Sequence, residues 1–323
     1  MKRFAEILLF AAGIACLAAP NPARSQAYPV KPIRTIMTVA GGADILARLV
    51  AQKLTESMGQ SVVVESQSGA GGAIGAEMVA RAAPDGYTLM LSSASTQVMH
   101  VFLSKQTRFD ALKSFTPITR IAETILLVVS HPALPVNSIG ELIDYARRNP
   151  GKLSYGTSGI GTSHHLSAEL MRLLTGIEWV HVPYKGGPPV LTDLMSGRIE
   201  VGFTILATMI PFMSSGKIRI LAVNNNRRYS VIPDVPTVGE QLPGYEAPPS
   251  WMAYFGPTGL PEPIVKRLNA EIARAMNSPD VRAKAQEIGF VPGASTPEEV
   301  TAMIRHDLAT VGKLVQAVGI KPE

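Results

Sequence analysis

Short runs of β-branched and apolar residues alternate with longer helical patterns along most of this 323-residue chain. Segment 33–39 is rich in Ile, Thr and Val, as strands are, and segment 44–58 repeats apolar residues at helical spacing before Gly59. Helices of this length supply the crossovers that parallel strands need. This order of elements predicts an α/β fold of mostly parallel sheets flanked by helices.

The same alternation places the remaining elements. We expect further strands over 62–64, 87–91, 126–129, 153–156, 178–182, 199–203, 218–223 and 251–255. We expect further helices from the glycine-rich run at 69 to residue 83, and over 138–149, 163–175 and 189–195. Residues 224–250 are rich in Pro, Asn and Gly, which predicts an irregular stretch. Three helical patterns finish the chain, the last starting at a capping box at 296–299, and we expect them to add no strands.

The first 27 residues have the pattern of a secretory signal peptide. Lys2 and Arg3 precede an apolar run over 7–19, and Ser25 and Ala27 are the small residues that a cleavage site needs. The apolar run is short for a bilayer span, which takes about 20 residues. We expect cleavage after Ala27 and a periplasmic product; the alternatives are a retained anchor or a lipoprotein modified at Cys16.

Charge and cysteine content change when this leader is set aside. The formal net charge of +5 falls to +3 without Lys2, Arg3, Arg24 and Glu6. Cys16 is the one cysteine of the sequence, so the remaining chain can form neither a disulfide nor a Cys-ligated metal site. The remaining Lys and Arg residues are scattered, without the aromatic interleaving that stacks on nucleic acid. We expect no nucleic-acid partner.

Nucleotide and nucleophile motifs are incomplete in this sequence. The run GTSGI at 156–160 has Ile160 where a nucleophile elbow needs its second glycine. The run GAGGAI at 69–74 fails the dinucleotide-binding pattern in the same way. Lys185 lies in a Pro-Tyr-Lys-Gly-Gly turn, which is typical of a surface or ligand-facing charge rather than of a Schiff-base nucleophile. We expect no cofactor and no enzymatic activity.

The histidines do not form a metal motif either. His164 and His165 are adjacent and point about 100° apart on a helix, so they cannot bind one ion as a pair. The other histidines, His100 among them, lack acidic residues at ligand spacing, so we expect structural or surface roles and no metal. The alternative function is an exported α/β hydrolase that uses Ser158 or Ser163 with a neighbouring histidine.

Small, hydroxyl and glycine residues recur where a strand ends and a helix begins. They occupy 40–43, 92–96 and 156–163. Ligands of open α/β sheets bind beyond the carboxyl ends of the strands, where helix N-termini offer free N–H groups to anions. The alternative is that these loops need Gly and Ser only for turning and capping. The three loops are therefore candidates for an anion site.

Several motifs resemble one known family. They are YPVKPIR at 28–34, the stretch from GAGGAIGA to PDGYTL at 69–89, GTSGIGTSHHLSAEL at 156–170, HVPYKGG at 181–187, PDVPTV at 233–238 and GLPEPIVKRLNAEI at 259–272. Together they cover essentially the whole chain after the leader. The sequence resembles the Bug family, the extracytoplasmic solute-binding proteins of tripartite tricarboxylate transporters.

The resemblance implies a two-lobe periplasmic binding protein of the type II kind, with lobes joined by crossover strands. The first lobe would comprise 28–127 and 249–323, and the second 128–248. A small carboxylate or dicarboxylate would be enclosed between the lobes and presented to the membrane subunits of a tripartite tricarboxylate transporter. We expect the receptor to be a monomer.

The resemblance also implies the residues of the ligand site, carried over by position. The candidates are Gly41, Gly42, Ala43, Ser93, Thr96, Ser158, Gly159, Thr162, Ser163 and His164, with Tyr184 and Thr204 at the cleft wall. Asp44 matches the family's Asp after the glycines and is expected to cap a helix and shape the loop rather than meet an anion. The loop before it is about two residues shorter than the family pattern and lacks both of its prolines, which we expect to alter the choice of ligand.

Overall fold

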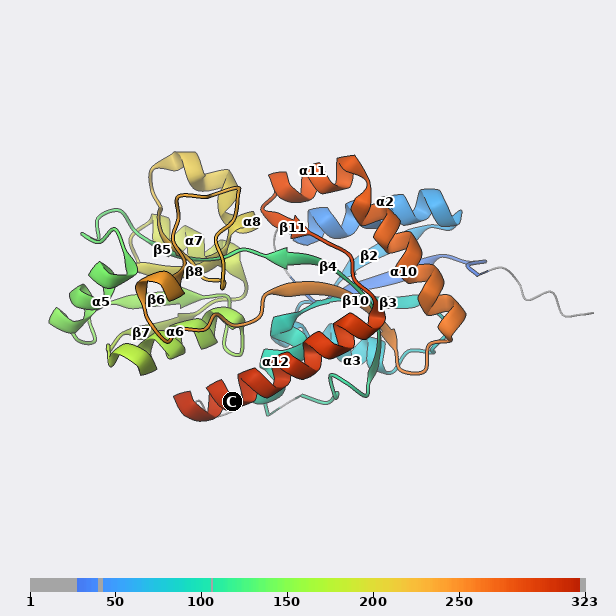
Figure 1. Cartoon of the computed structure of the whole chain (residues 1–323), viewed down its shortest axis with the longest axis horizontal. Coiled ribbons are helices and arrows are strands. Elements are labelled where there is room, and N and C mark those ends of the chain that lie inside the picture. Colours follow the sequence, from blue (N-terminus) through green and yellow to red (C-terminus); the bar gives the residue numbers. More distant parts are fainter. Residues whose placement is uncertain (1–27, 40–42, 106, 320–323) are drawn as a thin grey trace, which may run out of the picture.

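Two mixed β-sheets, each flanked by helices, form two lobes that lie side by side (Figure 1). The computed structural model describes residues 28–39, 43–105 and 107–319. The expected leader, residues 1–27, and two candidate site residues, Gly41 and Gly42, lie outside this range. No helix in the part of the chain so described is long and apolar enough to cross a membrane.

The first lobe is built on a six-stranded sheet of order β11-β4-β10-β3-β1-β2. Its strands are β1 (Ile33–Met37), β2 (Val62–Ser66), β3 (Thr88–Ser93), β4 (Phe115–Thr124), β10 (Trp251–Pro257) and β11 (Phe290–Pro292). Its helices are α2 (Ala43–Met58), η2 (Ala70–Gly72), α3 (Ala73–Ala80), η3 (Ser95–Met99), α4 (His100–Leu103), α10 (Glu262–Asn277), α11 (Pro279–Glu287) and α12 (Pro297–Val318).

The second lobe is built on a five-stranded sheet of order β7-β6-β8-β5-β9. Its strands are β5 (Leu126–Ser130), β6 (Ser154–Thr157), β7 (Val180–Pro183), β8 (Val201–Ile205) and β9 (Arg219–Val223). Its helices are α5 (Ile139–Arg148), α6 (Ser163–Thr175), α7 (Gly187–Met195), α8 (Leu206–Met209), η4 (Ile210–Ser215) and α9 (Val238–Gln241).

The expected α/β fold is confirmed, and both of its sheets are mixed rather than purely parallel. Strand β1 pairs parallel with β2 and β3, and β6 pairs parallel with β7 and β8. Strand β10 is antiparallel to β3 and β4, and β5 is antiparallel to β8 and β9. The chain enters each of these two strands from the hinge. Each strand therefore starts at the hinge side of its sheet, which is where its neighbouring strands end. The crossovers thus impose the antiparallel pairs.

Two strands and one helix end differ from the sequence expectation, and the short helical segments η3, α4, α8, η4 and α9 were not predicted, α9 lying within the stretch expected to be irregular. Strand β4 was not predicted, since Pro117 and polar residues interrupt its apolar pattern. Strand β11 lies between the last two helices, where no strand was expected. Pairing with β4 stabilises this short segment. Such a tertiary contact cannot be predicted from the sequence of the segment alone. The helix expected to reach residue 83 ends at Ala80.

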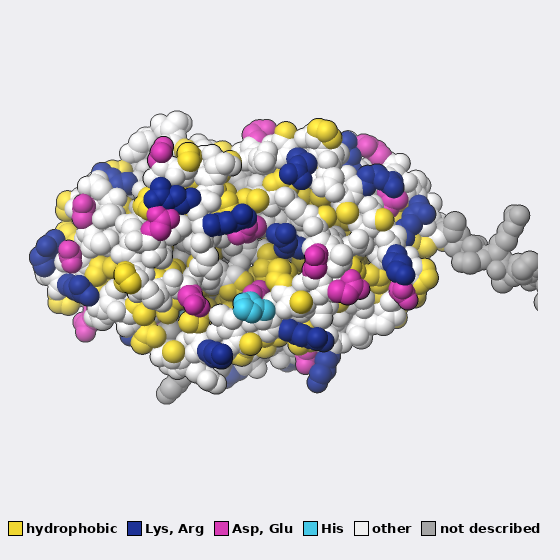
Figure 2. All heavy atoms as spheres, in the orientation of Figure 1, with side chains coloured by type: hydrophobic (Ala, Val, Ile, Leu, Met, Phe, Trp, Pro, Cys, Tyr) yellow, Lys and Arg dark blue, Asp and Glu magenta, His cyan; other side chains and the backbone are white. Residues whose placement is uncertain are grey.

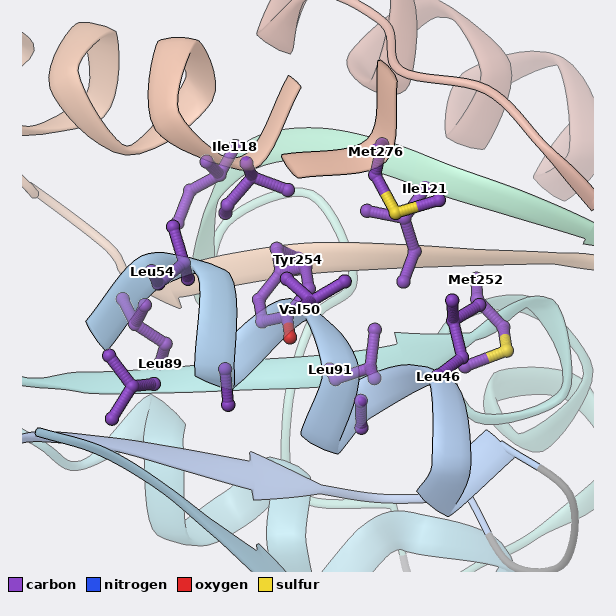
Figure 3. Packing of buried hydrophobic residues seen from close by; sticks show 14 of the residues in the cluster. Leu46, Val50, Leu54, Leu89, Leu91, Ile118, Ile121, Met252, Tyr254 and Met276 are labelled. Atoms are coloured by element: carbon purple, nitrogen blue, oxygen red, sulfur yellow. The ribbon is translucent and has the colours of Figure 1, made fainter. Parts of the chain in front are cut away.

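Helix α2 covers one face of the first sheet and forms much of its core (Figure 3). Leu46, Val50 and Leu54 recur every four residues and have no exposed surface. They pack in one cluster with side chains of β3 and β10, including Leu89 and Tyr254. The helical spacing of the sequence thus fixes which face of α2 is buried.

The two lobes are joined by more than the two crossovers. Strand β4 continues into β5 through Ile125, and the chain returns to the first sheet at β10. Helix α12 runs along both lobes (Figure 1): Ile304 belongs to the core of the first lobe, and Leu314 packs against the core of the second. Leu166 of α6 reaches in the other direction, into the first-lobe core. The ends of β1, β3 and β6 therefore face one another across the hinge.

Candidate functional site

A cavity of about 730 Å³ lies between the lobes. The first lobe contributes the residues that follow β1 and β3, the loop from Ser68 to Gly71, and α4. The second lobe contributes the turn between β6 and α6 and the turn at 184–187, and the hinge contributes residues near Thr124 and Trp251. This is the expected place for a ligand of an open α/β sheet, beyond the carboxyl ends of its strands.

The cavity brings together most of the candidate residues. Those on its wall are Ala43, Ser93, Thr96, Ser158, Gly159, Thr162, Ser163, His164 and Tyr184. Asp44 is not on the wall: it lies in the first turn of α2, and its carboxylate accepts hydrogen bonds from Arg48 at 2.7 and 3.0 Å. Thr204 is buried in β8 behind the wall.

Helix α6 begins at the cavity with its N-terminus fixed by side chains. Thr162 is the N-cap, and its hydroxyl accepts a hydrogen bond from the amide of His165 and donates one of 2.7 Å to the carbonyl of Gly159. Ser158 Oγ lies 2.7 Å from His164 Nδ1. Burial lowers the pKa of His164 to about 4, against a smaller opposing effect of the Thr204 backbone, so the imidazole is neutral near pH 7. The second lobe therefore offers a capped, preorganised helix end.

On the first-lobe side, the hydroxyl groups are bonded mainly to each other. Thr38 Oγ1 donates to Ser92 Oγ at 3.0 Å and lies 3.3 Å from Thr96 Oγ1, and Thr96 donates to the carbonyl of Gly71 at 3.0 Å. Ala70, Gly71 and Gly72 all have positive φ angles, of 51°, 63° and 91°. A Cβ on Gly72 would lie 2.4 Å from Thr96 Oγ1 and 2.7 Å from the Thr38 carbonyl oxygen. Only glycine allows this close approach.

The lobes touch directly beside the cavity. The Oγ atoms of Ser95, which follows β3, and Ser163 lie 3.3 Å apart. The Ser163 amide also donates a hydrogen bond of 3.3 Å to Ser95 Oγ. The Ser163 hydroxyl also donates to the carbonyl of Pro249 in the crossover, at 3.0 Å. Ser163 thus joins both lobes and the hinge, a role that its position before a helix does not reveal.

The charges on the wall are of one sign. Among the residues that the structure describes, no Asp or Glu lines the cavity, and Lys185 is the one lysine or arginine that does. Lys185 is exposed, and no carboxylate of those residues lies within ion-pair distance of it. Outside the cavity, the face in Figure 2 shows Lys and Arg interspersed with Asp and Glu. Positive charge without a protein counter-ion favours an anionic ligand.

Sequence reasoning missed part of the wall. The loop from Ser68 to Gly71 was interpreted as the opening of a helix, although three glycines within four residues are a signal of left-handed backbone. His100 was given a structural or surface role, and it lines the cavity. No sequence signal identifies Ser104, Thr124 or Ser250 as wall residues, because their place depends on how the lobes meet.

The geometry gives limited support to a hydrolase. Ser158 and His164 form a serine–histidine contact, but within the described range burial and the Thr204 backbone account for the pKa of His164, and no carboxylate contributes. A histidine acting as general base in a triad is oriented by such an acid. The same range holds no group of three or more His, Cys, Asp or Glu residues that could bind a metal ion.

Comparisons with known proteins agree with this architecture. BugT of Bordetella pertussis is 32% identical over 319 residues, which cover 98% of this chain and 96% of BugT. The structure titled R. palustris Rpa4515 with adipate is 35% identical, has a TM-score of 0.86 and covers 92% of this chain and all of the other. MatC of Rhodopseudomonas palustris with bound malate is 28% identical, has a TM-score of 0.81 and covers 90% of this chain and all of the other.

A protein family is matched over most of the sequence. Residues 46–320 match the family described as "Tripartite tricarboxylate transporter family receptor". The match spans both lobes and the cavity between them, and the two-lobe fold is that of the solved relatives. The chain therefore belongs to the tripartite tricarboxylate transporter receptor family, the family of the Bug solute-binding proteins.

Proposed function

We propose that this protein is a periplasmic receptor that encloses a small carboxylate or dicarboxylate between its lobes and delivers it to a tripartite tricarboxylate-type transporter. The observation that carries the proposal is the interlobe cavity, whose described wall has one unpaired lysine and no acidic residue. Its volume of about 730 Å³ is within the usual range of small-molecule sites, roughly 300–1,000 Å³. Relatives crystallised with adipate and with malate bind ligands of this class.

The carboxylate is held by groups of both lobes. The N-terminus of α6 directs its helix dipole at the cavity, and Ser158 and Thr162 lie beside it. Lys185 adds a positive charge from the neighbouring turn. Thr96 and Ser93 face these groups from the end of β3. A ligand that contacts both sets stabilises the closed arrangement of the lobes, so binding shifts the hinge equilibrium.

The domain limits, the location and the assembly state belong to the same proposal. Sheet pairing supports a change of lobe near residue 125, since β4 ends at Thr124 and β5 starts at Leu126. In place of the limit expected at residue 127, which would divide β5, we assign 28–125 and 249–319 to one lobe and 126–248 to the other. The leader pattern supports export with cleavage after Ala27, and the family description supports transfer of the solute to membrane subunits. We propose that the receptor does this as a monomer.

Thermal unfolding with added carboxylates tests the proposal. We expect adipate or malate to raise the melting temperature of the purified chain, because a ligand present at about 100 times its Kd adds about 2.7 kcal/mol to the unfolding free energy. Adipamide, which has the shape of adipate without its charges, should give no shift. Lys185→Met should reduce the carboxylate shift, whereas Lys152→Met, an exposed lysine of the same lobe outside the cavity wall, should not. A panel of mono- and dicarboxylates that leaves the melting temperature unchanged would contradict the proposal.

A further inference from the structure

His100 is a buried histidine on the cavity wall, outside the groups that the proposed function uses to hold the carboxylate. It is the first residue of α4, and 7% of its surface is exposed. Its ring lies at the seam between the lobes: a Cβ on Gly71 of the first lobe would be 3.3 Å from Nδ1, and a Cβ on Gly161 of the second lobe would be 3.9 Å from it. Ser163, two residues beyond Gly161, contacts the first lobe directly.

Neither nitrogen of this imidazole has a hydrogen-bond partner among the described residues. Nε2 is buried without one, and Nδ1 lies on the side of the two glycine loops. Buried polar groups in folded proteins are nearly always paired. His164 also has a buried Nε2 without a partner in the described range, but its Nδ1 is paired with Ser158. The two wall histidines therefore differ at Nδ1, and the unpaired Nδ1 of His100 is the atom left for a partner from outside the protein.

The charged and titratable groups around His100 indicate which kind of ligand group can bind its Nδ1. Burial lowers the pKa of His100, and the charge of Glu77 on α3 opposes this effect. From the second lobe, His164 is kept neutral by burial, and His165 places its Nδ1 3.5 Å from the Gly161 amide. No carboxylate lies on the described cavity wall. A carboxylate brought by a ligand would therefore be the first strong acceptor beside Nδ1.

We propose that His100 binds the ligand carboxylate and takes up a proton from solvent as the ligand is enclosed, so that solute binding is coupled to protonation. The inference rests on the proposed carboxylate receptor function. In the empty cavity the desolvated imidazole is neutral. A carboxylate at the seam favours the imidazolium, which then donates from Nδ1 in a charge-assisted hydrogen bond. At most one proton enters for each ligand bound, and the ligand itself is unchanged.

Titration calorimetry of the whole mature chain tests this coupling, with adipate and malate as the probes. Binding is measured near pH 7 in two buffers that differ in ionisation enthalpy, which gives the number of protons taken up per ligand. We expect roughly half to one proton, and an affinity that falls as pH rises by at most about tenfold per pH unit, as one linked proton requires. His100→Gln should retain weaker binding and lose the proton uptake.

The controls separate this inference from the proposed function and from a structural role. His306→Gln alters an exposed histidine of α12 outside the cavity wall and should leave the proton number unchanged. A structural role for His100 would lower the melting temperature of His100→Gln without changing the proton number. Wild-type binding with no proton uptake overturns the inference and leaves the receptor function standing. Failure of the wild type to bind any carboxylate probe overturns both.

Discussion

The two lobes line the same cavity, but their helix ends and their histidines differ in hydrogen bonding. In the second lobe, the N-terminus of α6 is capped by Thr162, and the one histidine that lines the cavity from this side, His164, is paired with Ser158 at 2.7 Å. In the first lobe, the helix that follows the glycine loop is preceded by Gly72 with no side-chain cap, and His100 is unpaired within the described residues. Among the described residues each lobe keeps buried polar atoms without a hydrogen-bond partner, Nε2 of both wall histidines included. The two walls differ at Nδ1, which is paired with Ser158 in His164 and has no partner among these residues in His100.

This difference indicates that the two lobes contribute to different steps of ligand binding. A preorganised helix end needs no rearrangement when an anion arrives, so it suits the first encounter with a ligand. An unpaired buried group gains most from a ligand, because the ligand removes the penalty of leaving it unsatisfied. The unpaired Nδ1 of His100 thus gives the first-lobe wall a reason to close over a bound carboxylate. Variants that affect one lobe at a time can test this contrast.

The largest effect is expected in the first-lobe glycine loop. Gly72→Ala should lower the unfolding free energy by about 4 kcal/mol, because the new Cβ meets Thr96 and the backbone of Thr38 and because φ is +91°. Gly176→Ala is the matched change in the second lobe: φ is +69°, but no atom lies within 4 Å of the new Cβ, so we expect about 1 kcal/mol. Urea denaturation measures both. Equal losses would show that the first-lobe loop is not tightly packed.

The next effect is the acid sensitivity of the second lobe. The pKa of His164 is lowered by burial to about 4, whereas an unfolded chain titrates its histidines near 6.5. As pH falls through 6.5, this histidine becomes protonated in the unfolded state but stays neutral in the folded state. The free energy of unfolding therefore falls until about pH 4. A difference of about 2.5 pKa units corresponds to about 3 kcal/mol. Burial also lowers the pKa of His181 in this lobe to about 4, which adds to the same trend.

Denaturation between pH 4.5 and 7.5 checks this sign. His164→Gln should be less stable at pH 7, where Ser158 loses its partner, and should show a flatter pH dependence than the wild type. His306→Gln changes an exposed histidine and should keep the wild-type slope. If the His164→Gln profile remains as steep as the wild-type profile, the acid sensitivity comes from other groups.

The contrast between the lobes also shows which helices, strands and site residues could be predicted from the sequence alone. Helix α6 matches its expected range of 163–175, since Thr162 and Gly176 are local start and stop signals. Strand β11 could not be predicted, because three residues become a strand only by pairing with β4. The hydroxyl loops were identified from composition, and the structure places those of their candidates that it describes on one cavity wall.

His100 shows why the rest of the site could not be predicted. Its nearest loops, at Gly71 and Gly161, belong to different lobes and are remote in sequence. Burial without a partner is a property of the assembled lobes, and a single histidine without acidic neighbours carries no local signal of it. The contact between Ser95 and Ser163 has the same origin.

The smallest effect concerns the helix cap that distinguishes the second lobe. Thr162→Ala removes the side chain that accepts from the His165 amide, so we expect a loss of about 1 kcal/mol in unfolding free energy. Thr296→Ala removes the N-cap side chain of α12, a first-lobe helix, where the hydroxyl accepts from the Glu299 amide within a capping box, and should cost a similar amount. Only Thr162 lines the cavity, so only Thr162→Ala should also weaken adipate binding in calorimetry. Equal affinity in the two variants would mean that the capped end of α6 does not hold the carboxylate, and that its binding groups lie elsewhere on the cavity wall.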